Sequence, residues 1–139
     1  MRGSICLFMA GLTEFAKWLI DGRNVGVLAT LMPDGAPHLS PVYVDRDGDV
    51  VLVNTVIGRV KYRNVKRDSR VSLVVLDHLN PLQYVEIRGR VVELTTEGAE
   101  EHIDMLANRY MGVEKHPFRK PGQRRVIMKI VADRVVEYR

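Results

Sequence analysis

The stretch that decides the fold is "VGVLATLMPDGAPHLSPVYV", residues 25–44. Two apolar, β-branched runs flank a turn that contains proline and an Asp-Gly pair, Asp34 and Gly35. This arrangement is typical of an antiparallel hairpin, because Asp-Gly readily adopts the backbone conformations of tight turns. We therefore expect two neighbouring strands, over residues 24–31 and 38–44.

Further strands follow on the C-terminal side. Apolar and β-branched runs that predict them occupy residues 50–55, 70–76, 82–94 and 125–138, the last as one strand or two. Residues 45–49, "DRDGD", are expected to be a turn, and Gly89 predicts a bulge or bend of the kind that a barrel corner needs. The order is not a repeated βαβ pattern. It predicts a mainly β (α+β) domain, a six-stranded antiparallel barrel with peripheral helices.

Three segments predict the helices. Residues 13–22 begin at a Thr13 cap and stop at Gly22, with Phe15, Trp18 and Leu19 at helical spacing. Residues 58–67 form a short helix after a loop. Residues 95–112 form a third, capped by threonine at its start and closed by glycine.

The third predicted helix has two faces. Ile103, Leu106 and Tyr110 form its apolar stripe. Glu101, His102 and Asp104 are expected to be a solvated face, since none of the four histidines has metal-ligand spacing with another histidine or cysteine. We therefore expect no metal site.

Length and composition favour one domain over residues 1–139. Residues 1–12 suit a disordered leader, with Met9 as an alternative native start. The single Cys6 excludes an intrachain disulfide and fits a cytoplasmic protein. No apolar run reaches the roughly 18–20 residues of a membrane span, so no membrane association is expected.

The positive charge is concentrated in two places. Residues 59–70, the first basic segment, hold six basic residues and only Asp68 as an acid. The rest of the chain holds 15 basic and 16 acidic residues of the 21 and 17 in total. Residues 115–125, the second basic segment, form a smaller cluster in an irregular loop. Two interpretations of the first remain open, a solvated helix face or a phosphate site in which Arg59 and Lys61 grip the anion at a helix start.

The familiar catalytic patterns are absent from the sequence. No dinucleotide or P-loop fingerprint is present, and Asp34, His38 and Ser40 lack the elbow motif of a hydrolase. If the chain is an enzyme, the reactive atom belongs to a cofactor. Nucleic-acid binding is less favoured, because only Tyr62 interrupts the first basic segment and stacking platforms need more aromatic residues near their cations.

Three motifs occur together in order. They are T-x-x-x-DG-x-P from Thr30, R-x-K-x-x-N-x-x-R-D from Arg59 and V-E-I-x-G from Val85. With the runs around them, over about residues 20–131, they resemble the pyridoxamine 5'-phosphate oxidase-like, FMN-binding split β-barrel family. The resemblance is closest to the branch of F420-dependent flavin/deazaflavin oxidoreductases.

This resemblance implies a homodimer of split barrels, with cofactor sites between the subunits and Arg59 and Lys61 on the cofactor phosphate. We call Arg59 and Lys61 the phosphate clamp. The resemblance further implies that Ser40, Pro41 and Val42 lie behind the cofactor ring, and that Val53, Asn54 and Thr55 lie beside it. It also implies that Asn64 steadies the clamp, and that Tyr84 reaches the cofactor at a position where other members often have glutamine.

The implied function is an oxidoreductase, a flavoprotein or deazaflavin protein that transfers hydride between bound F420 or FMN and a small organic substrate. No side-chain catalytic residue is assigned. A non-catalytic flavin- or heme-type binding protein is the alternative. Pyridoxamine phosphate oxidation itself is less favoured, because the arginine-rich C-terminal segment of the true oxidases is not matched. The second basic segment is either a solubilising loop or a contact for an acidic group.

Overall fold

A computed structural model of the chain describes residues 7–8 and 11–139. The described residues form eight strands: β1 (Leu7–Phe8), β2 (Gly26–Leu31), β3 (Pro37–Val42), β4 (Asp45–Asp47), β5 (Val50–Val56), β6 (Arg70–Leu76), β7 (Tyr84–Thr95) and β8 (Arg125–Tyr138). Three helices accompany them: α1 (Glu14–Asp21), α2 (Val60–Arg67) and α3 (Ala99–Met111).

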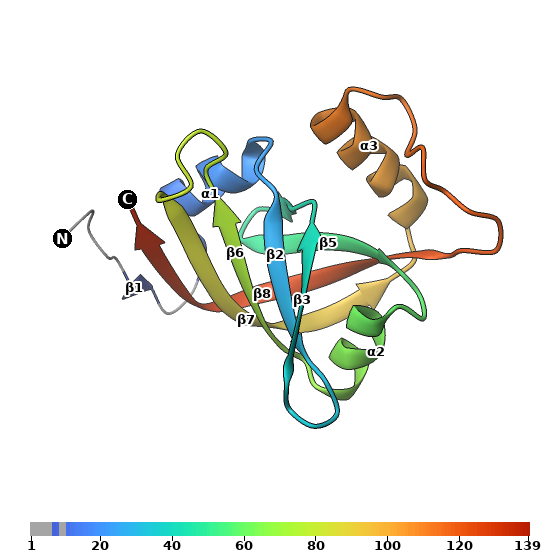
Figure 1. Ribbon diagram of the computed structural model, residues 1–139, viewed down its shortest axis with the longest axis horizontal. Helices are drawn as coiled ribbons and strands as arrows, with labels where there is room; N and C mark the ends of the chain where they lie inside the picture. Colours follow the sequence, from blue (N-terminus) through green and yellow to red (C-terminus); the bar gives the residue numbers. More distant parts are fainter. Residues whose placement is uncertain (1–6, 9–10) are drawn as a thin grey trace.

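The strands form one curved antiparallel sheet in the order β3-β2-β6-β7-β8-β5-β4, with β1 added on β8. Figure 1 shows α1 near the ends of the chain, whereas α2 and α3 lie at the opposite end, on either side of the start of β8. The predicted antiparallel split-barrel class is confirmed. The predicted number of six strands is wrong, since residues 45–47 pair with β5 as a short strand rather than forming part of a turn, and Leu7–Phe8 pair with β8.

The hairpin predicted from residues 25–44 is confirmed. Strands β2 and β3 pair from Gly26 opposite Val42 to Leu31 opposite Pro37. The turn closes through a 2.8 Å hydrogen bond from the Met32 backbone N–H to the Ala36 carbonyl. Gly35 adopts a φ of 87°, a left-handed conformation that glycine reaches without steric cost.

Side chains that alternate along the strands fill the barrel. On β5, Val51, Val53 and Thr55 are completely buried, whereas Asn54 between them is partly exposed on the other face. The same alternation on β6 and on the first half of β7 points valine, leucine and isoleucine inward. One closely packed apolar core results, to which α1 adds Ala16, Leu19 and Ile20.

The predicted irregularity at Gly89 is also present. The pairing of β7 with β8 shifts between Arg88 and Gly89, so the strand carries a bulge there. A side-chain Cβ at this position would meet the carbonyl oxygen of Val131 at 2.1 Å, far inside contact distance. Only glycine therefore allows the two longest strands to approach each other at this bend.

The helix ends agree only in part with the prediction. Thr13 caps α1, accepting a 3.0 Å hydrogen bond from the Ala16 N–H, and Gly22 ends the helix. Trp18, which the helical spacing grouped with Phe15 and Leu19, is 58 % exposed. The cap of α3 is Gly98 in a left-handed conformation rather than a threonine, because Thr95 instead bonds the backbone of Glu97.

The prediction that residues 1–12 form a disordered leader falls partly outside the described residues, as do Cys6 and Met9. Where this segment is described, Leu7–Phe8 pair with β8 and Leu12 packs into the core, so those residues are structured. Within residues 7–8 and 11–139, we find no helix with both the length and the apolar character that crossing a bilayer requires.

Candidate functional site

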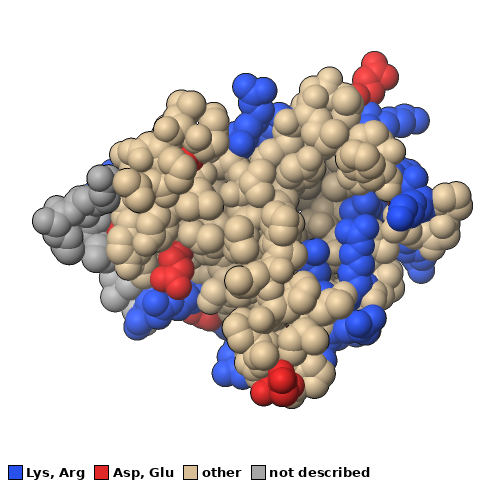
Figure 2. All heavy atoms as spheres, viewed as in Figure 1, with Lys and Arg blue, Asp and Glu red and all other residues tan. Residues whose placement is uncertain are grey.

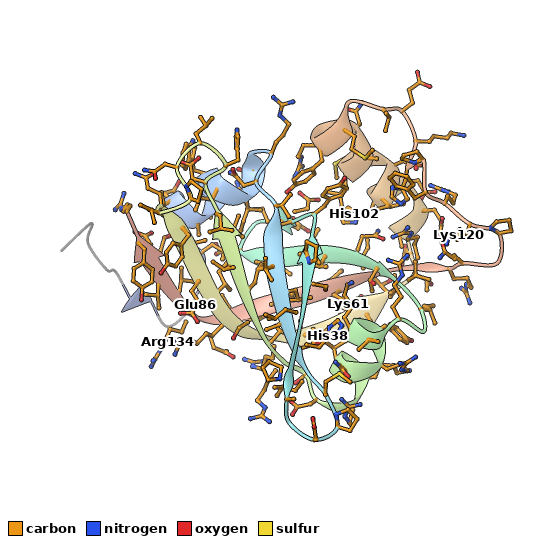
Figure 3. The ribbon with its side chains drawn as sticks, in the orientation of Figure 1. His38, Lys61, Glu86, His102, Lys120 and Arg134 are labelled. Carbon is orange, nitrogen blue, oxygen red and sulfur yellow. The ribbon has the colours of Figure 1, made fainter. Side chains whose placement is uncertain are left out.

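A pocket of about 440 Å³ lies at the end of the barrel that carries α2 and α3. Its walls come from the ends of β3 and β5, the start of α2, the inner face of α3 and the loop before β8. Its lining consists of Val25, Pro41, Val42, Tyr43, Asn54, Arg59, Lys61, Ile103, Leu106, His116, Phe118 and Arg125. Figure 2 shows basic side chains gathered around a hollow on the right of the molecule, and Figure 3 places Lys61 between α2 and the sheet.

Three cations converge on this pocket from two parts of the chain. Arg59 and Lys61 come from the start of α2, and Arg125 is the first residue of β8. Within the described part of the chain, none of the three charged side chains forms a salt bridge within 4.0 Å, although such bridges occur elsewhere on the surface. The Glu100 carboxylate is nearby, where it accepts a 2.9 Å hydrogen bond from the Arg125 backbone N–H. Desolvation, together with the charges of Arg59 and Arg125, lowers the pKa of Lys61. Burial and the charge of Arg59 likewise lower the pKa of Arg125.

These two shifts mean that the surroundings of Lys61 and Arg125 in the folded chain disfavour the charged form of each side chain. An anion placed among them would reverse that penalty. Arg59 also occupies the N-cap of α2, and its side chain makes no capping hydrogen bond to the first turn. The N–H groups and the positive dipole end of α2 therefore add to the attraction for an anion.

The opposite wall is apolar and aromatic. Ile103 and Leu106 of α3 are buried behind it, and Val42 closes it from β3. Tyr43 stacks on Tyr110 with ring centroids 4.2 Å apart. The Tyr110 hydroxyl is fixed by donating to the Asn24 carbonyl at 2.8 Å, so this aromatic wall is held in place. A flat apolar ligand would find a firm surface here.

His116, in the second basic segment, adds a titratable group. Its imidazole lines the pocket and packs edge-on against Phe118. Its Nδ1 atom is buried, and no partner for it lies among the described residues. Burial and the charges of Arg125 and Arg119 lower the pKa of His116, which favours the neutral ring at physiological pH.

Behind the pocket, α3 contributes a buried histidine that the sequence analysis placed wrongly. His102 is only 9 % exposed, and its Nε2 lies 3.0 Å from Oδ2 of Asp45. Its Nδ1 lies 3.1 Å from Nδ2 of Asn54, a pocket residue. Of the three residues predicted to face solvent, only Glu101 is exposed. Asp104 is half-buried and accepts a 2.9 Å hydrogen bond from the His116 N–H. The helical spacing of His102 from Ala99 and Leu106 was the signal that could have placed it inside.

The residues expected to bind a cofactor divide into four groups. Pro41, Val42, Asn54, Arg59 and Lys61 line the pocket together. Ser40 instead lines an adjoining, more open hollow that shares Arg59 and Lys61, and its Oγ is buried with no partner in the described part of the chain. Val53 and Thr55 point into the core, and neither residue lines the pocket.

The last two expected residues lie away from the pocket. Asn64 is 2 % exposed, donates to Thr30 Oγ1 at 3.0 Å and accepts from Arg67, so it ties α2 to β2. This suits the steadying role that the resemblance implied. Tyr84 lies at the start of β7 and stacks on Tyr138, with centroids 4.5 Å apart. The fold of a single chain does not bring it to the pocket.

Sequence reasoning missed several pocket residues, namely Val25, Tyr43, Ile103, Leu106, His116, Phe118 and Arg125. The second basic segment was noticed, but nothing in its sequence singled out Arg125 as the residue that joins Arg59 and Lys61. Asp34, His38 and Ser40 make no hydrogen bonds to one another, and Asp34 instead caps the hairpin turn. Among the described residues, no group of three or more His, Cys, Asp or Glu side chains could hold a metal ion.

The donor set fits a phosphate attached to a flat ring. Three cations and a helix start provide for the anion, and the wall of Tyr43 and α3 provides for an apolar ring system. The pocket volume falls within the range of small-molecule sites. Fold and site together define a split β-barrel with a site suited to a cofactor that carries a phosphate.

Comparison with known proteins identifies the family to which the chain belongs. Residues 12–138 match the model of the pyridoxamine 5'-phosphate oxidase family, and the chain belongs to this family. It is also similar to a solved F420 reductase, with 28 % identity, a TM-score of 0.77 and coverage of 89 % of this chain and 98 % of that one. The family resemblance inferred from the sequence is thereby confirmed.

Two further solved structures share the fold. One is a conserved hypothetical protein from Mycobacterium tuberculosis, with 23 % identity, a TM-score of 0.72 and coverage of 99 % of this chain and 90 % of that one. The other is General Stress Protein 26 from Bacillus anthracis, with 20 % identity, a TM-score of 0.67 and coverage of 90 % and 92 %. At these identities the likeness supports the fold alone.

Proposed function

We propose that the chain is an oxidoreductase that binds a flavin-type cofactor, F420 or FMN, and transfers hydride between it and a small organic substrate. The observation that carries the proposal is the set of three cations, Arg59, Lys61 and Arg125, beside an apolar wall and without a side-chain salt bridge in the described part of the chain. Membership of a family that includes an oxidase, and likeness to an F420 reductase, support it.

In this proposal each part of the pocket has one task. Arg59 binds a phosphate oxygen through its planar fork, and Lys61 and Arg125 neutralise the remaining charge. Tyr43 and the α3 face exclude water from one side of the ring and fix its orientation. When bound, the cofactor ring supplies the hydride chemistry. No side-chain acid is needed at the reacting atom.

The proposal includes a homodimer, as the resemblance implies, in which a second chain covers the open side of the pocket. Binding of the cofactor and of the second chain would then support each other, since each adds contacts to the other's surface. Sedimentation with and without cofactor measures this coupling.

The test of cofactor binding compares FMN, F420 and riboflavin, which shares the ring and polyol chain of FMN but lacks the phosphate. Titration followed by ring fluorescence should show FMN or F420 binding at least about 100-fold more tightly than riboflavin, because several charge-assisted hydrogen bonds are lost without the phosphate. Riboflavin binding as tightly as both would contradict the clamp.

Catalysis needs a separate measurement, because a cofactor carrier would pass the binding test. Reduced cofactor on the protein should be oxidised by an added two-electron organic acceptor faster than free cofactor is. Equal rates would instead favour a non-catalytic binding protein with the same clamp.

A further inference from the structure

We infer that His102 is a positioning residue that turns the Asn54 side chain so that its carbonyl oxygen faces the pocket as a hydrogen-bond acceptor. The pocket would then select an anionic ligand that carries a hydroxyl or N–H donor beside its anionic group. The choice of a phosphate as that anion rests on the proposed function. The inference concerns a buried histidine that the binding proposal does not use.

The direction of the Asn54 amide follows from its neighbours. Its Nδ2 lies 2.9 Å from the backbone carbonyl of Ala99, which can only accept a hydrogen bond. The atom facing Ala99 must therefore be the amide nitrogen. The same nitrogen lies 3.1 Å from Nδ1 of His102, so that ring atom has to be an acceptor.

The tautomer of His102 agrees with this direction. On the other side of the ring, Nε2 lies 3.0 Å from the carboxylate oxygen Oδ2 of Asp45, where a proton on Nε2 makes a hydrogen bond. An imidazole with its proton on Nε2 leaves Nδ1 free to accept from Asn54. Two contacts from two different elements thus assign the same tautomer.

Asp45 is itself held as a carboxylate. Burial acts to raise the pKa of Asp45, but the hydrogen bonds from His102 and the Arg46 backbone and the charge of Arg109 bring it below its ordinary value. Arg109 donates to the second oxygen of Asp45 at 3.1 Å. The chain of contacts Arg109–Asp45–His102–Asn54 therefore runs from the rim of α3 to the pocket, with each donor meeting an acceptor.

At the pocket, Oδ1 of Asn54 can accept a further hydrogen bond. Both hydrogens of the Asn54 amide are used, on Ala99 and on His102. Among the residues that the structure describes, its Oδ1 meets only the Arg125 guanidinium, at a long 3.5 Å. A carbonyl oxygen accepts two hydrogen bonds, so one position remains for a ligand donor. Arg125 also belongs to the cation set, so this donor would lie next to the anionic group.

A matched pair of phosphates tests the selection. Ribitol 5-phosphate and n-pentyl phosphate have the same chain length and the same charged end, but only the first carries hydroxyls. Calorimetric titration of the unmodified chain should give tighter binding of ribitol 5-phosphate by about threefold to tenfold, the effect of one hydrogen bond.

Two substitutions of His102 separate positioning from packing. In His102→Asn, the polar end of the side chain replaces Nδ1 and can still accept from Asn54, whereas in His102→Gln it replaces Nε2 and keeps only the contact with Asp45. We expect the preference for ribitol 5-phosphate to survive in His102→Asn and to fall to about one in His102→Gln. Thermal unfolding of both variants reports any shared loss of packing.

The outcomes distinguish this inference from the clamp. An undiminished preference in His102→Gln would overturn the positioning role while leaving the phosphate site intact. Binding of neither phosphate by the unmodified chain would overturn both. A measurement that needs no variant is the long-range ¹⁵N–¹H spectrum of the histidines, in which His102 should show the tautomer with its proton on Nε2. A proton on Nδ1 at neutral pH would contradict the inference.

Discussion

The first and second basic segments look alike in the sequence, but the fold uses them differently. In the first, only Arg59 and Lys61 reach the pocket. The others serve the fold or face solvent: Arg63 binds the Gly58 carbonyl, Arg67 the Leu31 carbonyl, Arg70 pairs with Asp68, and Lys66 lies over the Tyr62 ring. In the second, Arg125 enters the pocket, whereas Arg119 is neutralised by Glu100 and Asp104.

The difference shows that the side chains of the pocket cations have, within the described residues, no carboxylate or backbone carbonyl as a partner. The charge of a lysine or arginine that pairs with a nearby carboxylate is already offset. An arginine that donates to a backbone carbonyl keeps its charge, but that contact occupies its donors and holds its side chain away from the pocket. The cations left without such a partner, and partly desolvated, provide the attraction for an anion. Charge density along the chain locates the neighbourhood of the site but does not select its members.

The largest expected effect comes from reversing one pocket cation. Lys61→Glu should weaken binding of the phosphate-bearing cofactor by about 3 kcal/mol, more than about 100-fold, because a desolvated carboxylate would face the phosphate. Fluorescence titration measures it. Lys66→Glu, a reversal in the same helix but away from the pocket, is the matched control and should stay within about threefold. Equal losses in the two variants would mean that the whole segment acts as a diffuse charge.

A second comparison lies within the second basic segment. Arg125→Gln should weaken cofactor binding about tenfold, yet raise the stability of the ligand-free chain by on the order of 1 kcal/mol, because it removes a cation that burial and Arg59 disfavour. Arg119→Gln should leave binding nearly unchanged and slightly lower stability, since it loses two carboxylate partners. Calorimetry and thermal unfolding give both quantities. A drop in stability for Arg125→Gln would argue against an unfavourable interaction of the Arg125 charge with its buried surroundings and with Arg59.

The structural role of the first segment predicts a loss of stability without a loss of binding. Arg67→Ala should destabilise the fold by about 1 kcal/mol, because it removes the 2.6 Å hydrogen bond to the Leu31 carbonyl and the 2.9 Å hydrogen bond to Asn64. Denaturant unfolding measures this loss. Arg70→Ala, which removes only an exposed pair with its neighbour Asp68, should be indistinguishable from the unmodified chain. A binding defect in Arg67→Ala would place it in the site after all.

The smallest effect concerns His116 and pH. Its pKa lies below the ordinary value in the ligand-free chain, and a bound anion would raise it, so binding should take up a proton. Affinity should therefore rise by about threefold as pH falls from about 7.5 to about 5.5. His116→Asn serves as the reference, because any titration of the ligand itself remains in that variant and cancels in the comparison. An identical pH dependence of the two proteins would exclude proton uptake by this ring.

Much of the fold could be predicted from the sequence, because its signals are local. The Asp-Gly turn, the β-branched runs and the Thr13 cap each act within a few residues of themselves. The strand count was wrong at Asp45–Asp47, where three polar residues pair with β5 through contacts that no apolar pattern reveals. Likewise, the cap of α3 depends on the backbone of Gly98 rather than on a side chain.

The site was less accessible to sequence reasoning because it is assembled from distant segments. Asn54, Arg59 and Lys61 lie close in sequence, were predicted as cofactor-binding residues, and line one pocket. His116, in the loop that follows α3, and Arg125, at the start of β8, line the same pocket, and only the three-dimensional fold brings them there. Val53 and Thr55 were placed beside the ring, but the twofold alternation of β5 turns their side chains inward, a distinction that the strand pattern already contained.

Because side chains alternate along β5, the inward-facing and outward-facing positions of this strand should respond differently to substitution. At positions 51, 53 and 55 the side chains support the interior, so most replacements there should cost the chain its fold. At position 54 the side chain meets the pocket, and at 50 and 52 it lines a groove on the outer surface of the sheet. Ligand preference can thus change through position 54 during evolution while positions 51, 53 and 55 stay constrained, although a single backbone layer separates the two faces.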